Sequence, residues 1–95
     1  MTELTLRLYI AGDSISSRRA QQNLRRLKTV IESDSWTIEI VDVLESPALA
    51  EEAAIIATPT LTWEDGERVR RIVGDLSDTR RVLEFLGIEL KGKIA

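Results

Sequence analysis

The chain has 95 residues, of which 43% are hydrophobic and 31% are charged, and its formal net charge is −3. This balance predicts one folded domain with a single ordinary core, and it excludes a disordered, collagenous or membrane-embedded chain. Cysteine and histidine are both absent, which excludes disulfides, thiol nucleophiles, thiolate metal sites and imidazole bases.

The first half of the sequence predicts a β-α-β unit. Alternating apolar residues from Leu4 to Ile10 predict a first strand. An amphipathic helix is expected from about Ser16 to Ser33, because apolar residues recur there at helical spacing. Five cations fall mostly off its apolar stripe: Arg18, Arg19, Arg25, Arg26 and Lys28. The segment "WTIEIVDV" then predicts a second strand, parallel to the first.

The next part of the sequence predicts a short helix and a β-hairpin. Ser46 and Pro47 are typical of a helix start, and we expect this helix to run from Pro47 to Ile56. "TPTLTW" and "RVRRIVG" predict two antiparallel strands. Asp65-Gly66 lies between them and is a strong signal for a two-residue hairpin turn.

The last helix completes a recognisable layout. Ser77 is expected to cap "DTRRVLEFL", Gly87 to close it, and residues 88–95 to form a loose tail of a single domain, 1–95. The order β-α-β-α-β-β-α is that of an α/β thioredoxin-like fold: a four-stranded mixed sheet, ordered 2-1-3-4, with three helices. Pro59 would open the third strand, where that fold keeps a cis peptide; a trans proline is the alternative, and the isomer stays open.

The turn after the first strand, Gly12-Asp13-Ser14-Ile15, does not indicate redox or phosphate chemistry. It has no sulfur, and thiol–disulfide exchange needs a thiolate. It has one glycine and no Lys-Ser/Thr pair, so it fails the P-loop and dinucleotide fingerprints. An ordinary capped turn is the simpler interpretation.

Neither the carboxylates nor the cations indicate an enzyme or a nucleic-acid binder. Glu51 and Glu52 are adjacent on a helix and so point in different directions, while Asp78 is a typical first-turn charge beside Asp75. The cations of the first helix and of "RVRR" could form a basic face, but aromatic residues for stacking bases are scarce. We expect no catalysis, cofactor, metal or nucleic acid, which leaves protein binding as the general class.

The two ends of the sequence indicate in which cellular compartment we expect the protein. "MTELTLRLYI" reads neither as a signal peptide nor as a membrane span, and "GKIA" is no lipidation motif. We therefore expect a cytoplasmic protein without a membrane partner.

Three segments together resemble the KaiB family, the small clock proteins of cyanobacteria with relatives in other bacteria: "LRLYIAG", "IVDVLESPALAEEAAIIATPTL" and "RVRRIVGDLSD". The resemblance runs from about Leu4 to Leu86. The thioredoxin-like sensor domain of the clock histidine kinase shares "ATP" but lacks "GDLSD". The resemblance implies a non-enzymatic timing protein that binds the N-terminal ATPase ring of KaiC and, in a full clock, then sequesters KaiA.

The resemblance also implies two alternative folds. One family state is a tetramer whose second half has a different secondary structure, and the other is a thioredoxin-like monomer that binds KaiC. Family members usually have a proline-rich stretch where this chain has "TWEDGERV", in which Asp65-Gly66 supports a hairpin. We expect the thioredoxin-like fold and a monomer in dilute buffer, with the tetrameric KaiB ground state as the alternative.

The resemblance carries two sets of residues onto this chain. The KaiC-facing set is Gly12, Arg19, Glu51, Glu52, Ile56, Ala57, Thr58 and Pro59. The fold-switch set is Asp65, Gly66, Gly74, Asp75 and Asp78. Of these, Gly74, Asp75 and Asp78 match the family's switch-region motif, while Asp65 and Gly66 lie in the stretch that departs from the family pattern. We expect a contact centred on Glu52, Ile56 and Thr58, with Arg19 beside it. The apolar run Ile55-Ile56-Ala57 supports this, because only part of such a run can face the core; the alternative is that both isoleucines pack inward.

Besides the "TWEDGERV" stretch, this chain departs from the family pattern at three further places. Ala53-Ala54 stand where cyanobacterial members have Asp-Lys, which removes charge from the expected contact helix. Glu39 replaces a lysine on the KaiA-facing edge, which argues against KaiA as a partner, and "ELKGKIA" replaces an acidic tail. The alternative function is a KaiB-like adaptor for a different signalling partner, such as a histidine kinase.

Overall fold

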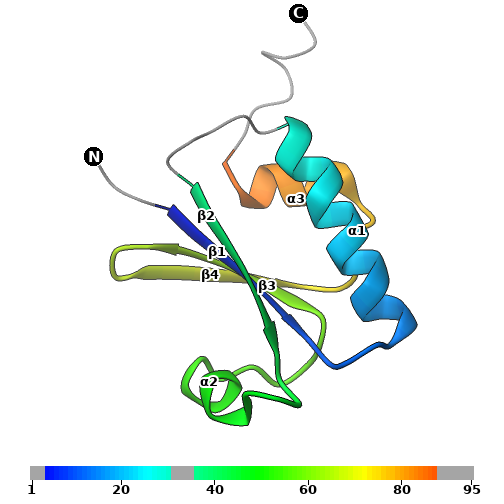
Figure 1. The fold of residues 1–95 in the computed structure, drawn as a ribbon. Coiled ribbons are helices and arrows are strands. Elements are labelled where there is room, and N and C mark those ends of the chain that lie inside the picture. Colours follow the sequence, from blue (N-terminus) through cyan, green and yellow to red (C-terminus); the bar gives the residue numbers. More distant parts are fainter. Residues whose placement is uncertain (1–3, 31–35, 88–95) are drawn as a thin grey trace, which may run out of the picture.

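The computed structural model describes residues 4–30 and 36–87 (Figure 1). Its element order confirms the predicted succession β-α-β-α-β-β-α. The elements are β1 (Leu4–Ile10), α1 (Ile15–Val30), β2 (Trp36–Asp42), α2 (Pro47–Glu52), β3 (Thr60–Asp65), β4 (Arg68–Val73) and α3 (Thr79–Phe85).

The four strands form one mixed sheet in the order β2-β1-β3-β4, as predicted. β1 and β2 run parallel, with Leu8 opposite Ile40, and β3 pairs antiparallel with both β1 and β4. Figure 1 shows α1 and α3 together on one face of the sheet and α2 on the other side, below it. The sheet is therefore covered by two helices on one face and by a single short helix on the other.

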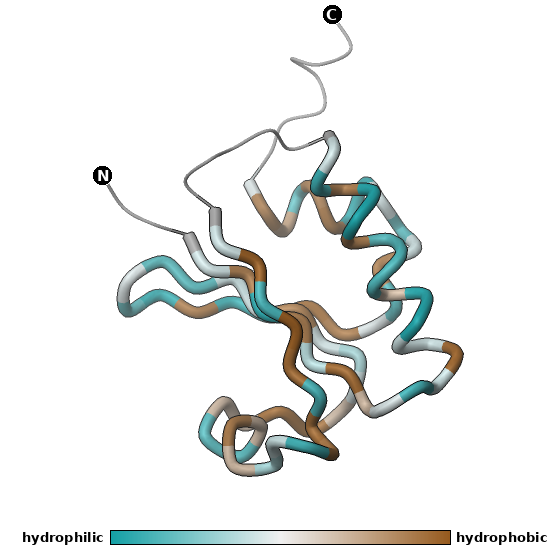
Figure 2. Tube along the Cα trace, viewed as in Figure 1, coloured by the Kyte–Doolittle hydropathy of each residue, from teal (hydrophilic) through white to brown (hydrophobic). Residues whose placement is uncertain are grey.

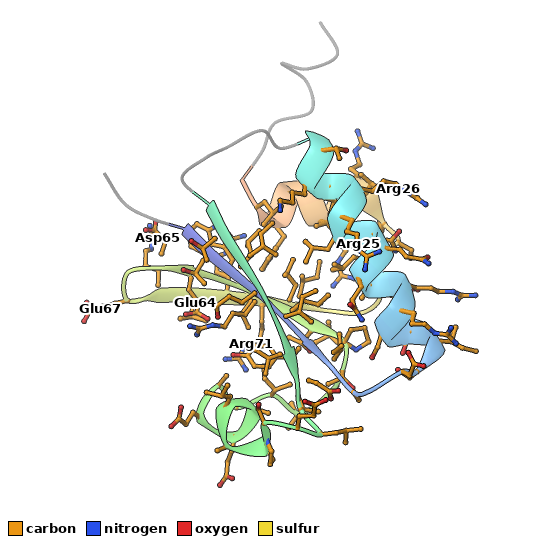
Figure 3. The ribbon with its side chains drawn as sticks, viewed as in Figure 1. Arg25, Arg26, Glu64, Asp65, Glu67 and Arg71 are labelled. Carbon is orange, nitrogen blue, oxygen red and sulfur yellow. The ribbon has the colours of Figure 1, made fainter. Side chains whose placement is uncertain are left out.

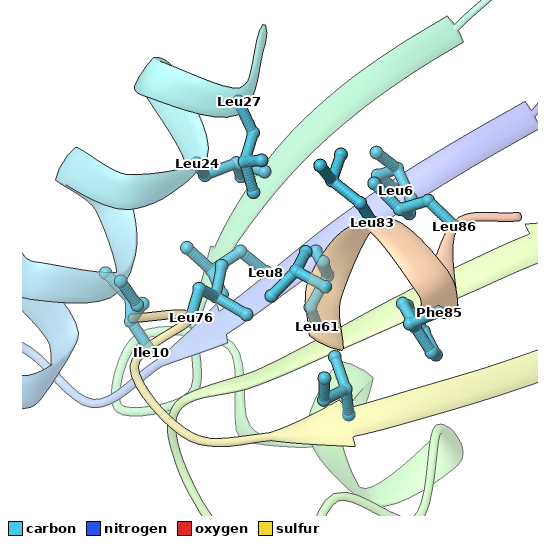
Figure 4. Close-up of a cluster of buried hydrophobic side chains, with 13 residues drawn as sticks. Leu6, Leu8, Ile10, Leu24, Leu27, Leu61, Leu76, Leu83, Phe85 and Leu86 are labelled. Carbon is cyan, nitrogen blue, oxygen red and sulfur yellow. The ribbon is translucent and has the colours of Figure 1, made fainter. Parts of the chain in front are cut away.

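The hydrophobic core lies between the sheet and the pair α1 and α3 (Figure 4). It exists because alternate strand residues point to this face and meet the apolar stripe of α1. Figure 2 shows the complementary pattern, with hydrophilic residues along much of α1 and hydrophobic stretches in the strands. The buried cluster is Leu6, Leu8, Ile10, Ala20, Leu24, Leu27, Leu61, Ile72, Leu76, Val82, Leu83, Phe85 and Leu86.

The start of α1 and the end of α2 differ from the sequence prediction. α1 begins at Ile15, because Ser14 is its cap and its Oγ accepts from the Ser17 amide at 3.2 Å; the predicted end at Ser33 lies outside the described residues. α2 ends at Glu52 and not at Ile56, because Ala54 has a left-handed backbone with φ of 55°. A left-handed residue stops an α-helix.

The predicted caps of α2 and α3 also need correction. Ser46 precedes α2 but makes no side-chain capping hydrogen bond, so the start rests on Pro47 at the first helical position. The cap of α3 is Asp78 and not Ser77, since the Arg81 amide donates to Asp78 Oδ1 at 3.2 Å. The helix starts one residue later than predicted, which brings the carboxylate into reach of the third helical amide.

The β3–β4 turn is shifted by one residue from the prediction. Asp65 pairs with Arg68, so the two loop residues are Gly66 and Glu67 and not Asp65-Gly66. Gly66 has a φ of 63°, and neither Asp65 nor Glu67 has a positive φ. A positive φ at only the first loop residue is typical of a type II′ turn, which matches the twist of the strands.

Candidate protein-binding surface

The predicted KaiC-facing residues gather largely where β1 and β2 end and β3 begins. Asp42 joins the two loops there, because its Oδ1 accepts from the amides of Gly12 and Leu44, both at 3.0 Å. Gly12 has a φ of 58°, and a Cβ at this position would lie 3.1 Å from Leu44 Cδ1. A side chain at residue 12 would therefore meet both backbone strain and a close neighbour.

The α2–β3 loop (residues 53–59) begins with a Schellman motif. The Ala54 amide donates to the Glu51 carbonyl at 3.1 Å, and the Ile55 amide donates to the Ala50 carbonyl at 2.9 Å. These two bonds and the positive φ of Ala54 are the defining features of that motif. Glycine usually fills the left-handed position, so the alanine here carries a steric cost.

The other end of this loop is fixed by β3 and β4. The Thr58–Pro59 peptide bond is cis, which answers the question that the sequence left open. Thr60 Oγ1 donates to the Ala57 carbonyl at 2.6 Å, and the Gly74 amide donates to the Pro59 carbonyl at 2.9 Å. Pro59 is buried, so only the middle of the loop is free to face outward.

Ile56 lies between these two anchors and is 98% exposed, while Ile55 is half-buried. The expectation that one isoleucine faces outward is confirmed, and the alternative that both pack inward is wrong. The reason differs from the predicted one, because both residues follow the helix and do not belong to it. Ile56 borders an open groove of about 420 Å³, lined by Val43, Pro47, Ala50, Glu51, Ile55, Ile56, Ala57 and Thr58.

The structure separates the two glutamates of α2. Glu51 lines the same groove as Ile56 and Thr58. Glu52 lines a second groove of about 520 Å³ on the α2 side of the sheet, together with Glu39 and Arg71. The residues that meet around Ile56 are therefore Glu51, Ala57 and Thr58, and not Glu52.

Arg19 lies on the exposed side of α1 and does not line the groove around Ile56. The pKa of Asp75 is lowered mainly by hydrogen bonds from the Ser77 side chain and backbone, with a smaller contribution from the charge of Arg19. Asn23 Nδ2 also donates to the Asp75 carbonyl at 2.8 Å. The Asn23 hydrogen bond ties α1 to the segment between β4 and α3.

The predicted fold-switch residues fall at opposite ends of the β3–β4 hairpin. Asp65 and Gly66 lie at its turn, whereas Gly74 and Asp75 follow the end of β4. Leu76 comes next and has a φ of 64°, although its side chain is buried in the core. A non-glycine residue at positive φ is uncommon, so core packing holds this backbone in place.

The open part of the α2 side carries an ion-pair network. Arg7 Nε lies 2.9 Å from Glu39 Oε1, and Arg7 Nη1 lies 3.1 Å from Glu64 Oε2. The hydrogen bond with Glu39 is the largest cause of the raised pKa of Arg7, and the charge of Glu64 adds to it. Glu39, the residue that departs from the family pattern, is thus engaged with its neighbouring strand.

Within the part of the chain that the structure describes, the cations of α1 and β4 do not form one basic face. Figure 3 shows Arg25 and Arg26 on α1, well away from Arg71 on the α2 side of the sheet. Arg70 lies on the other face of β4, with its guanidinium 5.6 Å from the ring centre of Trp63 and 5.4 Å from that of Phe85. Alternation along the strand sends Arg70 and Arg71 to opposite faces.

Sequence reasoning missed three positioning residues: Asp42, Asn23 and Arg71. An aspartate between a strand and a turn is a known signal for capping the following amides, so Asp42 could have been found. Asn23 and Arg71 bond to carbonyls far away in the chain, and no local pattern marks such contacts.

Within residues 4–30 and 36–87, no group of three or more histidine, cysteine, aspartate and glutamate side chains is placed to hold a metal ion. The helices in the same part of the chain are too short or too polar to cross a bilayer.

The fold of this chain is similar to that of solved thioredoxin-like structures. The thioredoxin Deadhead of Drosophila melanogaster superimposes with a TM-score of 0.75 at 15% identity, over 90% of this chain and 79% of that one. The N-terminal domain of Synechococcus elongatus SasA gives 0.70 at 20% identity, over 90% and 85%. At these identities the likeness shows the fold alone, and it confirms the thioredoxin-like prediction.

The sequence relatives are more specific. Circadian clock protein KaiB3 of Synechocystis sp. is 42% identical over 92 residues, which are 97% of this chain and 90% of that protein. The circadian clock oscillator protein KaiB of Nostoc punctiforme is 46% identical over 88 residues, 90% of this chain and 80% of that protein. The KaiB domain family matches residues 7–88. The chain therefore belongs to the KaiB family.

Proposed function

We propose that this chain is a non-enzymatic clock regulator that binds the N-terminal ATPase ring of a KaiC-type protein through the surface around Ile56. Membership of a family of circadian clock proteins supports the regulatory role. The observation that carries the choice of surface is Ile56, an isoleucine that is 98% exposed and lies beside Glu51.

The geometry suits a protein contact for two physical reasons. Burying a fully exposed isoleucine against a partner contributes about 1.5–3 kcal/mol, and a few such residues dominate most interfaces. The loop is fixed at both ends, by the Schellman motif at Ala54 and by the bonds at Ala57 and Pro59. A loop that is already ordered loses little conformational entropy on binding.

A titration of the full chain with the N-terminal ATPase domain of a KaiC-type protein tests this proposal. Ile56→Ser is expected to weaken binding at least about ten-fold, because the apolar anchor is lost. Ile40→Ser is the matched control, since Ile40 is 48% exposed and lies on the α1 side of β2. Ile40→Ser is expected to lower the free energy of unfolding more than Ile56→Ser does, because Ile40 is the less exposed of the two. If Ile40→Ser still binds and Ile56→Ser does not, the loss at Ile56 is due to recognition and not to unfolding.

Charge reversal tests the rim of the same surface. Glu51→Lys is expected to weaken binding, and Glu67→Lys, the same change at the distant β3–β4 turn, is expected to leave it unchanged. Joint reversal of Arg19 and Glu52 tests the remaining predicted contact residues. If wild type binds but none of the variants with changes at Ile56, Glu51 or Glu52 differs from it, the surface is elsewhere.

We further propose that the binding state is the thioredoxin-like monomer, located in the cytoplasm. The β3–β4 hairpin is fully paired, and Gly66 has the positive φ that its turn requires. Both features support this state over the alternative state, in which the second half of the chain has a different secondary structure. Sedimentation velocity at micromolar concentration should give a single species of about 10.7 kDa. A stable tetramer would contradict both the monomer and the preference for this fold.

The second candidate function is an adaptor for another signalling protein, such as a histidine kinase. It is favoured by Glu39, which bonds to Arg7 and presents a carboxylate where the family pattern has a lysine. The same feature leads us to propose that KaiA is not a partner. A pull-down with separate KaiC-type, KaiA-type and histidine-kinase baits decides between the two functions.

A further inference from the structure

Helix α2 packs on a smaller apolar surface than α1 and α3 do, with Tyr9 and Val41 as the buried apolar residues of the sheet on its side. Of its six residues only Ala50 is buried. A single buried methyl group contributes far less than the leucines that fix α1 and α3. Polar contacts therefore have a large share in setting where α2 and the loop after it lie.

One such contact joins the end of α2 to the sheet. Arg71 Nη1 of β4 donates to the Ala54 carbonyl at 3.0 Å. Figure 3 shows Arg71 on the side of the sheet that faces α2. Ala54 is the left-handed residue of the Schellman motif, two positions before Ile56. Arg71 thus holds the point at which the chain turns out of the helix.

The second attachment of the loop also comes from the end of β4. Its other end is bonded through the Gly74 amide, which donates to the Pro59 carbonyl. Arg71 and Gly74 are three residues apart on the same edge, so β4 holds residues 54 and 59 and leaves Ile56 between them. Among the described residues the Arg71 side chain makes no salt bridge, and its hydrogen bond to Ala54 is to a neutral carbonyl.

We infer that Arg71 is a positioning residue for the binding surface: by holding the Ala54 carbonyl it fixes the direction in which Ile56 is presented. The expected effect of Arg71 on affinity rests on the proposed function. The expected effect on the order of the loop in the free chain rests on the structure alone. The rival explanation is that Arg71 touches the partner directly through its charge.

The first test needs no partner. Backbone ¹⁵N relaxation of the free chain is measured for wild type, Arg71→Ala and Arg68→Ala. Arg68 is the matched control, an exposed arginine on the same strand whose side chain makes no salt bridge within the described part of the chain. Order parameters of Ile55 to Ala57 should fall in Arg71→Ala alone. Unchanged order parameters would overturn the inference, whatever the protein binds.

The second test measures affinity for the N-terminal ATPase domain of a KaiC-type protein. Arg71→Ala should bind about five-fold more weakly, the effect of one exposed hydrogen bond, and Arg68→Ala as wild type. Arg71→Lys, which keeps one donor, should recover part of the loss. The loss should persist between low and high salt, because the bond lies within the chain.

The outcomes separate the two proposals. If wild type does not bind, the proposed function fails while the relaxation test of Arg71 stands. If Ile56→Ser weakens binding but Arg71→Ala behaves like Arg68→Ala, positioning by Arg71 is wrong. A loss in Arg71→Ala that disappears at high salt would mean direct charge contact and would also overturn the inference.

Discussion

The two faces of the sheet differ in almost every respect. The face under α1 and α3 buries thirteen apolar residues in one cluster (Figure 4). The face toward α2 buries Tyr9 and Val41 and carries the Arg7 ion pairs, an open groove and a helix with one buried residue. Both faces belong to the same four strands, because successive side chains point to opposite sides.

This difference indicates that the two faces have different roles, one in stability and the other in binding. Folding free energy comes mainly from the α1 and α3 face, where removal of apolar area from water is largest. The α2 side is then free to present residues that contribute to binding and little to stability, of which Ile56 is the clearest. Substitutions on the two sides should therefore affect different measurements.

The largest expected effect is a core substitution. Leu61 is fully buried under α3, so Leu61→Ala should lower the free energy of unfolding by about 3 kcal/mol. Ile56→Ala should change it by less than about 0.5 kcal/mol, because the side chain is exposed. Urea denaturation of both variants checks this. If the two substitutions lowered the free energy of unfolding by similar amounts, the proposed difference between the two faces would be wrong.

Ala54 provides a stabilising prediction on the α2 side. Ala54→Gly should raise the free energy of unfolding by about 1 kcal/mol, because glycine adopts positive φ without the steric cost of a Cβ. Ala53→Gly is the control with the opposite sign, since Ala53 has a φ of −85°. Thermal unfolding of the pair measures both. If Ala54→Gly destabilises, the left-handed assignment is wrong.

The ion pairs of the open face should contribute less. Arg7→Met should cost about 0.5 kcal/mol, because partly exposed pairs are weak and Met keeps the apolar stem. The cost should shrink further in high salt. Denaturation at two salt concentrations tests this, and a cost equal to that of Leu61→Ala would contradict it.

The smallest effect concerns pH. The folded chain lowers the pKa of Asp75 below its ordinary 3.8, so its carboxylate stabilises the fold above that pH, and the contribution is lost as pH falls below it. Ser77→Ala should raise the pKa of Asp75, because it removes the largest cause. An NMR titration of Asp75 in both proteins decides the matter, and an unchanged pKa would refute the assigned cause.

The sequence predicted the fold well for physical reasons that lie within short stretches. Alternation from Leu4 to Ile10 and helical spacing up to Leu27 mark faces that meet in the core. The end of α2 was missed because alanine is the best helix former, and nothing local shows that Ala54 turns left-handed. The turn and cap shifts at Gly66 and Asp78 are one-residue errors of the same kind.

The candidate site was predictable only in part. That one isoleucine would be exposed was predicted because only part of an apolar run can face the core, although the structure places both isoleucines after the end of α2. The sequence does not predict which glutamate lies beside Ile56. Glu51 and Glu52 line different grooves only because of the way α2 is oriented on the sheet. The Arg71–Ala54 contact joins residues 17 apart and depends on the assembled sheet.

The most direct test of the account is the affinity of the N-terminal ATPase domain of a KaiC-type protein for wild type, Ile56→Ser and Ile40→Ser, measured by calorimetry in one buffer. The account predicts binding by wild type and by Ile40→Ser, and at least about ten-fold weaker binding by Ile56→Ser. Equal affinity of wild type and Ile56→Ser, with both chains folded, would contradict it.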